Sequence, residues 1–160
     1  MRLSTRTQYG LRMLCQLAQE YQKGPMQLSE IGSREGVSEK YLGQIMLILR
    51  NSSLVSAQRG SQGGYFLSRP PDRISVLEAF EVLEGEVLGA GDEAGAGSRS
   101  TGSAAGPAPQ GSEEGHDMAR AANEIWIRLR TLITGELARW TLEDLTKLAS
   151  WRSGYMDFSI

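Results

Sequence analysis

Cysteine is nearly absent from this chain, whose 160 residues include a single one, Cys15. One thiol excludes an intramolecular disulfide, so nothing predicts a secreted fold held together by disulfide bonds. Long apolar runs are also absent, since no window approaches the ~18 uninterrupted apolar residues of a membrane-spanning helix. The first ten residues, MRLSTRTQYG, lack the apolar stretch of a signal peptide. These absences predict a cytoplasmic protein with no membrane contact.

Patterns that carry catalysis or metal binding are missing as well. The sequence has no Cys-x-x-Cys pair, and His116 is its one histidine. It also has no nucleophile–base motif and no phosphate-binding glycine loop that leads into a helix. The sequence therefore predicts that the protein is not an enzyme and has no catalytic residues, no metal site and no cofactor.

Charge is distributed unevenly along the chain, although the formal net charge is only −2. Residues 1–70 hold nine Lys and Arg against four Asp and Glu, a balance of +5. The whole chain holds 17 basic and 19 acidic side chains, so residues 71–160 hold eight and fifteen, a balance of −7. A basic excess in one half predicts a nucleic-acid surface there, and the acidic half is expected to face solvent or a protein partner.

Residues 26–68 predict a helix, a tight turn, a second helix and a two-stranded hairpin. Leu28 and Ile31 are spaced for one face of a short helix, and Gly36 supplies the positive φ that ends it. Ser38 stands where the next helix needs an N-cap. The apolar residues of that second helix recur at helical spacing: Tyr41, Leu42, Ile45, Met46, Ile48 and Leu49. Its outward side chains include Glu39, Lys40, Gln44 and Arg50.

The hairpin begins with Leu54 and Val55 and returns with residues 65–67. The tip between them, QRGSQGG, is rich in glycine, which lets a backbone turn sharply and lie close to a phosphate or a groove wall. Arg59 is its one charged side chain. Any exposed hairpin can carry an Arg and several glycines, but this one follows two helices with helix-turn-helix spacing. The predicted fold is mainly α with a small β-hairpin wing, a winged helix-turn-helix, whose usual target is duplex DNA.

Helices are also predicted on both sides of this unit. Ser4 or Thr5 can cap a first helix that runs to about Tyr21. Ser75 and Glu78 have the spacing of a capping box for another short helix.

The second half of the chain changes composition abruptly. In Gly89–Gly115, 20 of 27 residues are Gly, Ala, Ser or Pro, which predicts a disordered loop. A long helix is expected from about Asp117, and Thr141 with Asp144 starts a short helix to about Leu148. The predicted domains are a winged helix-turn-helix at 1–87, the loop at 88–116, a dimerisation helix and short helix at 117–150, and an extended tail at 151–160.

The long helix carries more apolar side chains than a small winged domain can cover. Burial against a second subunit is the economical explanation, and a two-fold dimer suits a palindromic operator. The alternative is that the helix packs on its own domain. The predicted dimer contacts are Ile125, Trp126, Leu129, Leu132, Ile133 and Leu137.

Several stretches resemble the bacterial Rrf-two family of winged-helix transcriptional regulators: MRLSTRTQYGLRML, SEKYLGQI, LVSAQRGSQGGYFLS and ISVLEAFEVLEG. The resemblance covers residues 1–87 and about 117–145, and the R-G-x-x-G-G-Y wing is its most distinctive part. It implies a homodimer in which the long helices form the interface and each recognition helix lies in the major groove of double-stranded DNA.

The family that the chain resembles has several branches. Members that bind an iron–sulfur cluster carry three cysteines and a nearby histidine in the segment that matches this loop, because thiolates hold such clusters. The loop here has no cysteine, His116 stands at its edge, and Cys15 lies far away in sequence, so no cluster is expected. Those members also place a Glu where this chain has Gly43, which implies a different operator sequence.

The C-terminus, GYMDFSI, is similar to the tail of the family's cysteine-metabolism repressors, to which the chain is most similar in pattern. It also resembles the C-terminus of serine acetyltransferase, whose terminal Ile and carboxylate enter the active site of cysteine synthase (O-acetylserine sulfhydrylase). This resemblance implies cysteine synthase as a partner, bound through Asp157, Phe158, Ser159 and Ile160. The alternative is a tail that folds back over its own dimer or frays.

The resulting hypothesis is a homodimeric repressor of cysteine and sulfur metabolism genes, with cysteine synthase as protein co-regulator. In one alternative the tail binds or inhibits a partner enzyme and DNA binding is secondary. In another the regulator senses a redox or small-molecule signal, and Cys15, otherwise a buried apolar residue, is the candidate thiol. The predicted DNA-binding residues are Arg2, Ser4, Thr5, Arg6, Ser38, Lys40, Tyr41, Gln44, Arg50, Arg59, Gly60 and Ser61, of which Lys40, Tyr41 and Gln44 face base edges.

Overall fold

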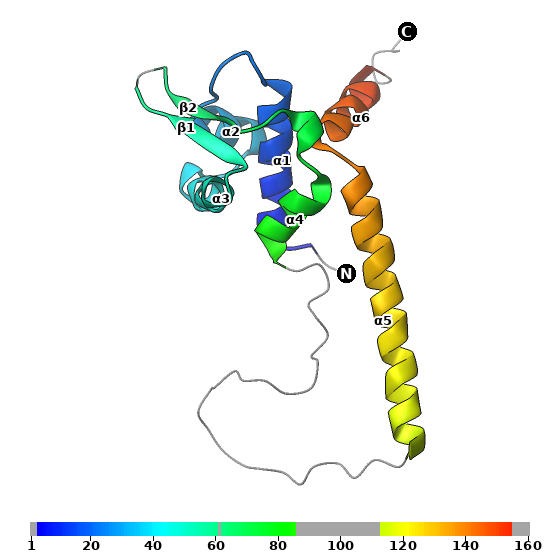
Figure 1. Ribbon diagram of the computed structural model, residues 1–160. Coiled ribbons are helices and arrows are strands. Elements are labelled where there is room, and N and C mark those ends of the chain that lie inside the picture. The colour runs from blue at the N-terminus through cyan, green and yellow to red at the C-terminus, as the bar shows by residue number, and fades with distance from the viewer. Residues whose placement is uncertain (1–2, 61, 86–112, 155–160) are drawn as a thin grey trace, which may run out of the picture.

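The computed structural model describes residues 3–60, 62–85 and 113–154 (Figure 1). Within these ranges the chain is mainly helical with one antiparallel hairpin, as the sequence predicts. None of the helices in these ranges is long and apolar enough to cross a bilayer. Several predicted features lie outside the described residues: most of the 88–116 loop, Arg2, Ser61, and the partner-binding residues Asp157, Phe158, Ser159 and Ile160.

The first helix, α1, spans Thr5–Gln19 and runs through the middle of the winged domain (Figure 1). Ser4 caps it, since the Ser4 hydroxyl accepts from the N–H of Thr7 at 3.2 Å. The helix ends before Tyr21, where the sequence predicted its end, because the chain turns at Gln22, whose φ is 69°. Its buried face consists of Thr7, Gly10, Met13, Leu14, Leu17 and Ala18.

The helix-turn-helix consists of α2, Leu28–Glu35, and α3, Glu39–Asn51. Gly36 ends α2 in the left-handed conformation with a φ of 65°, as predicted. Ser38 caps α3 by accepting from the N–H of Tyr41 at 3.4 Å, also as predicted. The buried residues of α3 are Leu42, Ile45, Met46 and Leu49.

The wing is formed by β1, Val55–Gln58, and β2, Gly64–Leu67, which pair antiparallel with Val55 opposite Leu67. A further bridge ties its root to the segment before α2. Met26 and Tyr65 exchange two backbone hydrogen bonds of 2.9 and 2.8 Å.

Gly64 lies at that bridge and has an internal reason to be glycine. A Cβ at this position would lie 2.5 Å from the carbonyl oxygen of Met26. The sequence predicted that the wing glycines allow a sharp turn and a close approach to DNA, whereas Gly64 is required for the close approach of two segments of the protein itself.

After the wing, a 3-10 turn, η1, spans Pro71–Arg73 and α4 spans Val76–Glu84. Ser75 caps α4 by accepting from the N–H of Glu78 at 3.1 Å, as predicted. The carboxylate of Glu78 binds Arg69 at 2.5 Å, so it ties α4 to the end of the wing instead of completing the predicted capping box.

The long helix, α5, spans Glu113–Arg139 and extends away from the winged domain (Figure 1). It begins four residues before Asp117, the predicted start, so residues 113–116 are helical and not part of a loop. The sequence is compatible with this earlier start, because acidic residues such as those at positions 113 and 114 are favoured in the first turn of a helix.

The last described helix, α6, spans Leu142–Gly154. Its predicted capping box is confirmed, since Thr141 N–H donates to Asp144 Oδ2 at 2.9 Å and Asp144 N–H donates to Thr141 Oγ1 at 3.2 Å. The helix continues past the predicted end at Leu148, so residues 151–154, predicted as extended tail, are helical. No Gly or Pro interrupts the sequence between Leu142 and Gly154.

One core joins all of these elements except most of α5. Leu142 at the start of α6 is fully buried in it, and so is Ile74 before α4. Backbone hydrogen bonds from Val76 N–H to Trp140 O at 2.8 Å and from Leu142 N–H to Ile74 O at 3.0 Å attach the C-terminal end of α5 to the same unit. The rest of α5 lies outside the core.

We predict that Gly64→Ala lowers the free energy of unfolding by about 1–3 kcal/mol, because the new methyl group must displace the Met26 backbone. Urea unfolding measures this effect. Gly43→Ala on α3 is the matched control, since its Cβ would meet its nearest neighbour, a Leu28 methyl, at 3.6 Å. That control is expected to gain about 0.5–1 kcal/mol. Equal stability of the two variants would contradict the internal role of Gly64.

Candidate nucleic-acid interface

Four exposed side chains line the face of α3 that lies opposite its buried residues: Lys40, Gln44, Leu47 and Asn51. We call this set the outward face of α3. Their spacing of three or four residues places them on one side of the helix. Half-buried Gly43 adjoins them. Lys40 and Gln44 lie where the sequence predicted, whereas Leu47 and Asn51 were missed, although their spacing from Gln44 was a usable signal.

Tyr41 and Ser38 are held by contacts within the protein. The half-buried Tyr41 ring packs edge-on against Tyr9 of α1, with 6.1 Å between centroids and an interplanar angle of 87°. The Arg12 guanidinium lies 5.7 Å from the centroid of the Tyr9 ring. Ser38 is exposed and caps α3. Because α1 covers part of the Tyr41 ring, only the uncovered part of the ring is available for the predicted base contact.

The wing lies on the same side of the molecule as α3, and α5 and α6 lie on the other side (Figure 1). Arg59 and Gly60 at the wing tip are exposed, and Gly60 has a φ of 116°. The N–H of Gly63 donates to the carbonyl oxygen of Gly60 at 2.9 Å, which closes the turn. Arg50 is exposed in the last turn of α3. The fold thus places the predicted residues of α3 and of the wing on one side.

The start of α1 differs from the prediction in one respect. The Ser4 hydroxyl donates to the carboxylate of Glu84 at 2.5 Å, and the buried Thr7 hydroxyl also donates to it. These bonds, with a smaller contribution from the charge of Arg6, hold the pKa of Glu84 below its ordinary value. Ser4 is therefore occupied by a carboxylate of the protein, whereas Thr5 and Arg6 are exposed and open to a phosphate.

Cys15 is half-buried on α1 beside Glu35. Burial, together with the charge of Glu35, raises the pKa of the thiol to about 11. Glu35 itself accepts from Arg12 at 3.1 Å and from Gln16 at 2.5 Å. Because the thiolate is the reactive form, Cys15 is predominantly unreactive at neutral pH.

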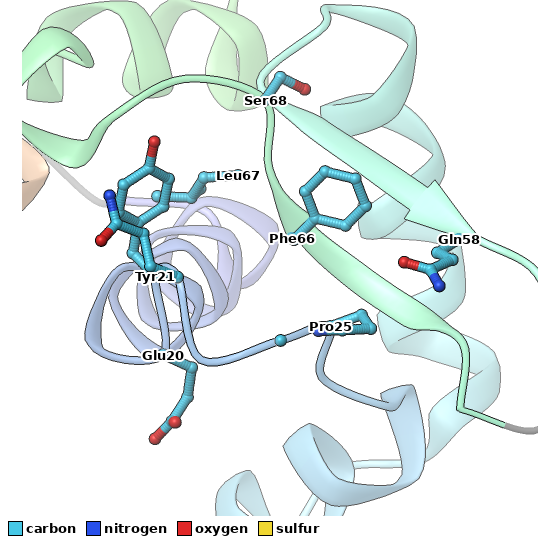
Figure 2. Close-up of a pocket in the computed structure, with 9 residues that line it drawn as sticks. Glu20, Tyr21, Pro25, Gln58, Phe66, Leu67 and Ser68 are labelled. Atoms are coloured by element: carbon cyan, nitrogen blue, oxygen red, sulfur yellow. The ribbon is translucent and has the colours of Figure 1, made fainter.

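An open pocket of about 430 Å³ lies between the end of α1 and the outer side of the wing. Figure 2 shows the rings of Tyr21, Pro25 and Phe66 around it, with the Glu20 side chain pointing away from them. Gln58 supplies an amide from β1. The volume falls in the range of small-molecule sites.

The predicted dimer residues of α5 differ in exposure. Ile125, Trp126, Leu129 and Leu132 are exposed, and Ile133 and Leu137 are half-buried. Trp126 keeps 61% of its surface exposed. Met118 and Ile127, which were not among the predicted contacts, are exposed as well. One described chain therefore leaves a large apolar surface on α5 uncovered.

Comparison with known proteins identifies related sequences and folds. The model of the family described as "Rrf2: Iron-dependent Transcriptional regulator" matches residues 3–148. The HTH-type transcriptional regulator CymR of Bacillus subtilis (strain 168) is 34% identical over 154 residues, which cover 96% of this chain and 94% of CymR.

Solved structures of transcriptional regulators show the same similarity. The structure of CymR, described as the global cysteine regulator of B. subtilis, gives a TM-score of 0.70 at 31% identity and covers 92% of this chain and 98% of that one. IscR of T. potens gives a TM-score of 0.68 at 31% identity, over 93% and 88% of the two chains. Both similarities extend well beyond the winged half.

The family description mentions iron, but one cysteine is too few for the usual iron–sulfur cluster held by thiolates, and the residues that the structure describes offer no iron site. The whole sequence offers one cysteine and one histidine. Among the residues that the structure describes, no group of three or more His, Cys, Asp or Glu side chains is placed to hold a metal ion. Cys15, with its raised pKa, is also a poor source of thiolate.

We predict slow alkylation of Cys15 by iodoacetamide in the folded protein. A thiol with a pKa of about 11 is roughly a hundredfold less ionised at pH 8 than one with a pKa of about 9, so the rate should keep rising up to about pH 11. Intact mass spectrometry of timed samples measures it. Glu35→Gln should speed the reaction modestly because it removes a negative charge. A rate that levels off at about pH 9–10 would show a thiol with an ordinary pKa and would contradict this prediction.

Proposed function

We propose, because this chain belongs to the Rrf2 family of DNA-binding transcriptional regulators, that it represses transcription as a homodimer on a palindromic operator. The family consists of transcriptional regulators and not of enzymes. The observation that carries the proposal is the outward face of α3, which presents Lys40 and Gln44 on the same side of the molecule as the wing with Arg59.

In this proposal α3 enters the major groove, whose width of about 12 Å accommodates one helix. The exposed amide of Gln44 is suited to the N6 and N7 edge of adenine, and Lys40 to guanine or a phosphate. Arg59 at the wing tip would reach the adjacent minor groove, where the negative potential is strongest when the groove is narrow.

Phosphate contacts would come from the edges of this surface. Thr5 and Arg6 at the start of α1 are exposed, as are Ser38 and Arg50 at the two ends of α3. The charge of Arg6 makes a small contribution to the lowered pKa of Glu84, so a phosphate would compete with Glu84 for that charge. Such contacts position the protein but carry no sequence information.

The homodimer is proposed from the uncovered face of α5. Monomeric proteins rarely leave contiguous apolar surfaces of this kind in water, and Trp126 and Leu132 are 61% and 69% exposed. A second copy related by a two-fold axis would cover this face with the same residues. It would also present two copies of α3, as a palindromic operator requires.

The cysteine-metabolism role is the finer part of the proposal. It is supported by similarity over 96% of the chain to CymR, a relative that is described as a global cysteine regulator. It is also supported by the sequence Asp157–Ile160, which resembles the segment of serine acetyltransferase that enters the active site of cysteine synthase. We infer that cysteine synthase binds this tail and acts as co-regulator.

DNA binding is expected to weaken steeply with salt, because phosphate contacts release counterions. With an operator duplex selected from random DNA, Arg6→Ala should reduce the slope of log Kd against log salt by about 1.8, which is about 0.9 for each subunit of the dimer. Gln44→Ala should weaken specific binding about 30-fold or more at an unchanged slope, because about 1–3 kcal/mol is lost in each half-site. Fluorescence anisotropy measures both quantities.

The matched control is Lys147→Ala on α6, on the side of the molecule away from α3 and the wing, where Lys147 pairs with Glu143 at 3.0 Å. It should change neither quantity. Salt-insensitive binding by the natural protein, or a Gln44→Ala variant that binds like it, would contradict the proposed interface.

The partner is tested by titrating the full chain with a pyridoxal-phosphate cysteine synthase and comparing a chain that lacks residues 158–160. We expect roughly micromolar or tighter binding that truncation abolishes and O-acetylserine displaces. No binding by either chain would reject the cysteine-synthase proposal while leaving DNA binding untouched. Tail binding without salt-dependent DNA binding would instead identify an interaction module.

A further inference from the structure

Leu47 is an apolar side chain in the middle of the polar outward face of α3. It is 55% exposed, and its neighbours along that face are Gln44 and Asn51, both exposed. The four buried residues of the same helix are at most 1% exposed. Burying a leucine side chain stabilises a fold by about 1.5–3 kcal/mol. A leucine that stays in water contributes little of this to the free energy of unfolding. Its contribution is expected to arise in a complex.

Gly43 has no side chain, so the surface of α3 beside Leu47 lies close to the helix backbone. The two residues are four apart, so they are neighbours on adjacent turns of α3. Within the part of the chain that the structure describes, no contact demands glycine at position 43, since a Cβ there would meet its nearest neighbour, a Leu28 methyl, at an ordinary 3.6 Å. The helix backbone is thus bare next to Leu47, and whatever faces α3 can approach closely on this side.

The charges around Leu47 indicate what it faces. Lys40 lies on the same face, and Arg50 is exposed on the same helix. Basic groups that flank a single apolar side chain suit a polyanion with an isolated apolar group better than they suit an extended apolar protein surface. In the major groove the apolar group that bases offer is the C5 methyl of thymine.

We propose that Leu47 is a specificity-determining residue that packs on a thymine methyl group in each half of the operator. The inference depends on the proposed function, because it requires α3 to lie in the major groove. Leu47 lies three residues after Gln44, about 4.5 Å further along the helix axis. Base pairs are spaced ~3.4 Å apart along the DNA axis, so the thymine lies one or two base pairs from the adenine that Gln44 contacts.

The test removes only the methyl groups. Operators are first selected from random duplex DNA with the natural protein, and each thymine is then replaced in turn, in both half-sites, by deoxyuridine. At one position the loss of affinity should be about fourfold for each half-site and about tenfold or more for both, which is what one lost methyl contact produces at each site. At that position Leu47→Ala should bind the thymine and deoxyuridine duplexes equally.

Leu148→Ala is the matched control, because Leu148 is a 46% exposed leucine on α6, on the other side of the molecule from α3. It should show the same thymine preference as the natural protein. Circular dichroism and sedimentation of each variant verify the fold and the oligomeric state.

The inference is overturned if no thymine gives a loss above about twofold, or if Leu47→Ala keeps the full preference. It is also overturned if Leu47→Ala changes the oligomeric state, since Leu47 then contacts another protein chain. Failure of the proposed function looks different, because the natural protein would then select no operator and show no salt-dependent binding even with thymine present.

Discussion

Burial of one side of α3 is the constraint on which the rest of the interface depends. Leu42, Ile45, Met46 and Leu49 are at most 1% exposed and pack in the core with α1 and α4. Each is worth about 1.5–3 kcal/mol when buried, so rotating the helix to present another side would be costly. The direction in which Lys40, Gln44 and Leu47 point is therefore set by apolar packing on the far side of the same helix.

Two other attachments join the wing and the end of α5 to the rest of the winged domain. The Met26–Tyr65 bridge ties the wing to the segment before α2, so Arg59 and α3 share one framework. The hydrogen bond from Val76 N–H to Trp140 O attaches the end of α5 to the start of α4. If a second copy packs on α5, these backbone hydrogen bonds connect it to the side of the molecule that carries α3 and the wing, without a flexible linker.

The sequence predicted the features that local chemistry decides. Gly36 needs a positive φ, and Ser38 and Thr141 are caps, so these boundaries were correct. Features decided by distant contacts were missed. Gly64 is required by Met26, 38 residues away, and Ser4 is engaged by Glu84. Leu47 was overlooked although its spacing from Gln44 places it on the outward face, because only polar and charged side chains of that face were considered as DNA contacts.

The most direct test of the account is hydroxyl-radical footprinting of the full-length protein on its selected operator. Two copies of α3 related by a two-fold axis should protect two symmetric patches whose centres lie about one helical turn, ~10 base pairs, or a multiple of it apart. The sugars of the adjacent minor groove, where Arg59 is proposed to reach, should also be protected next to each patch. A single asymmetric patch would contradict a homodimer that reads DNA with the outward face of α3.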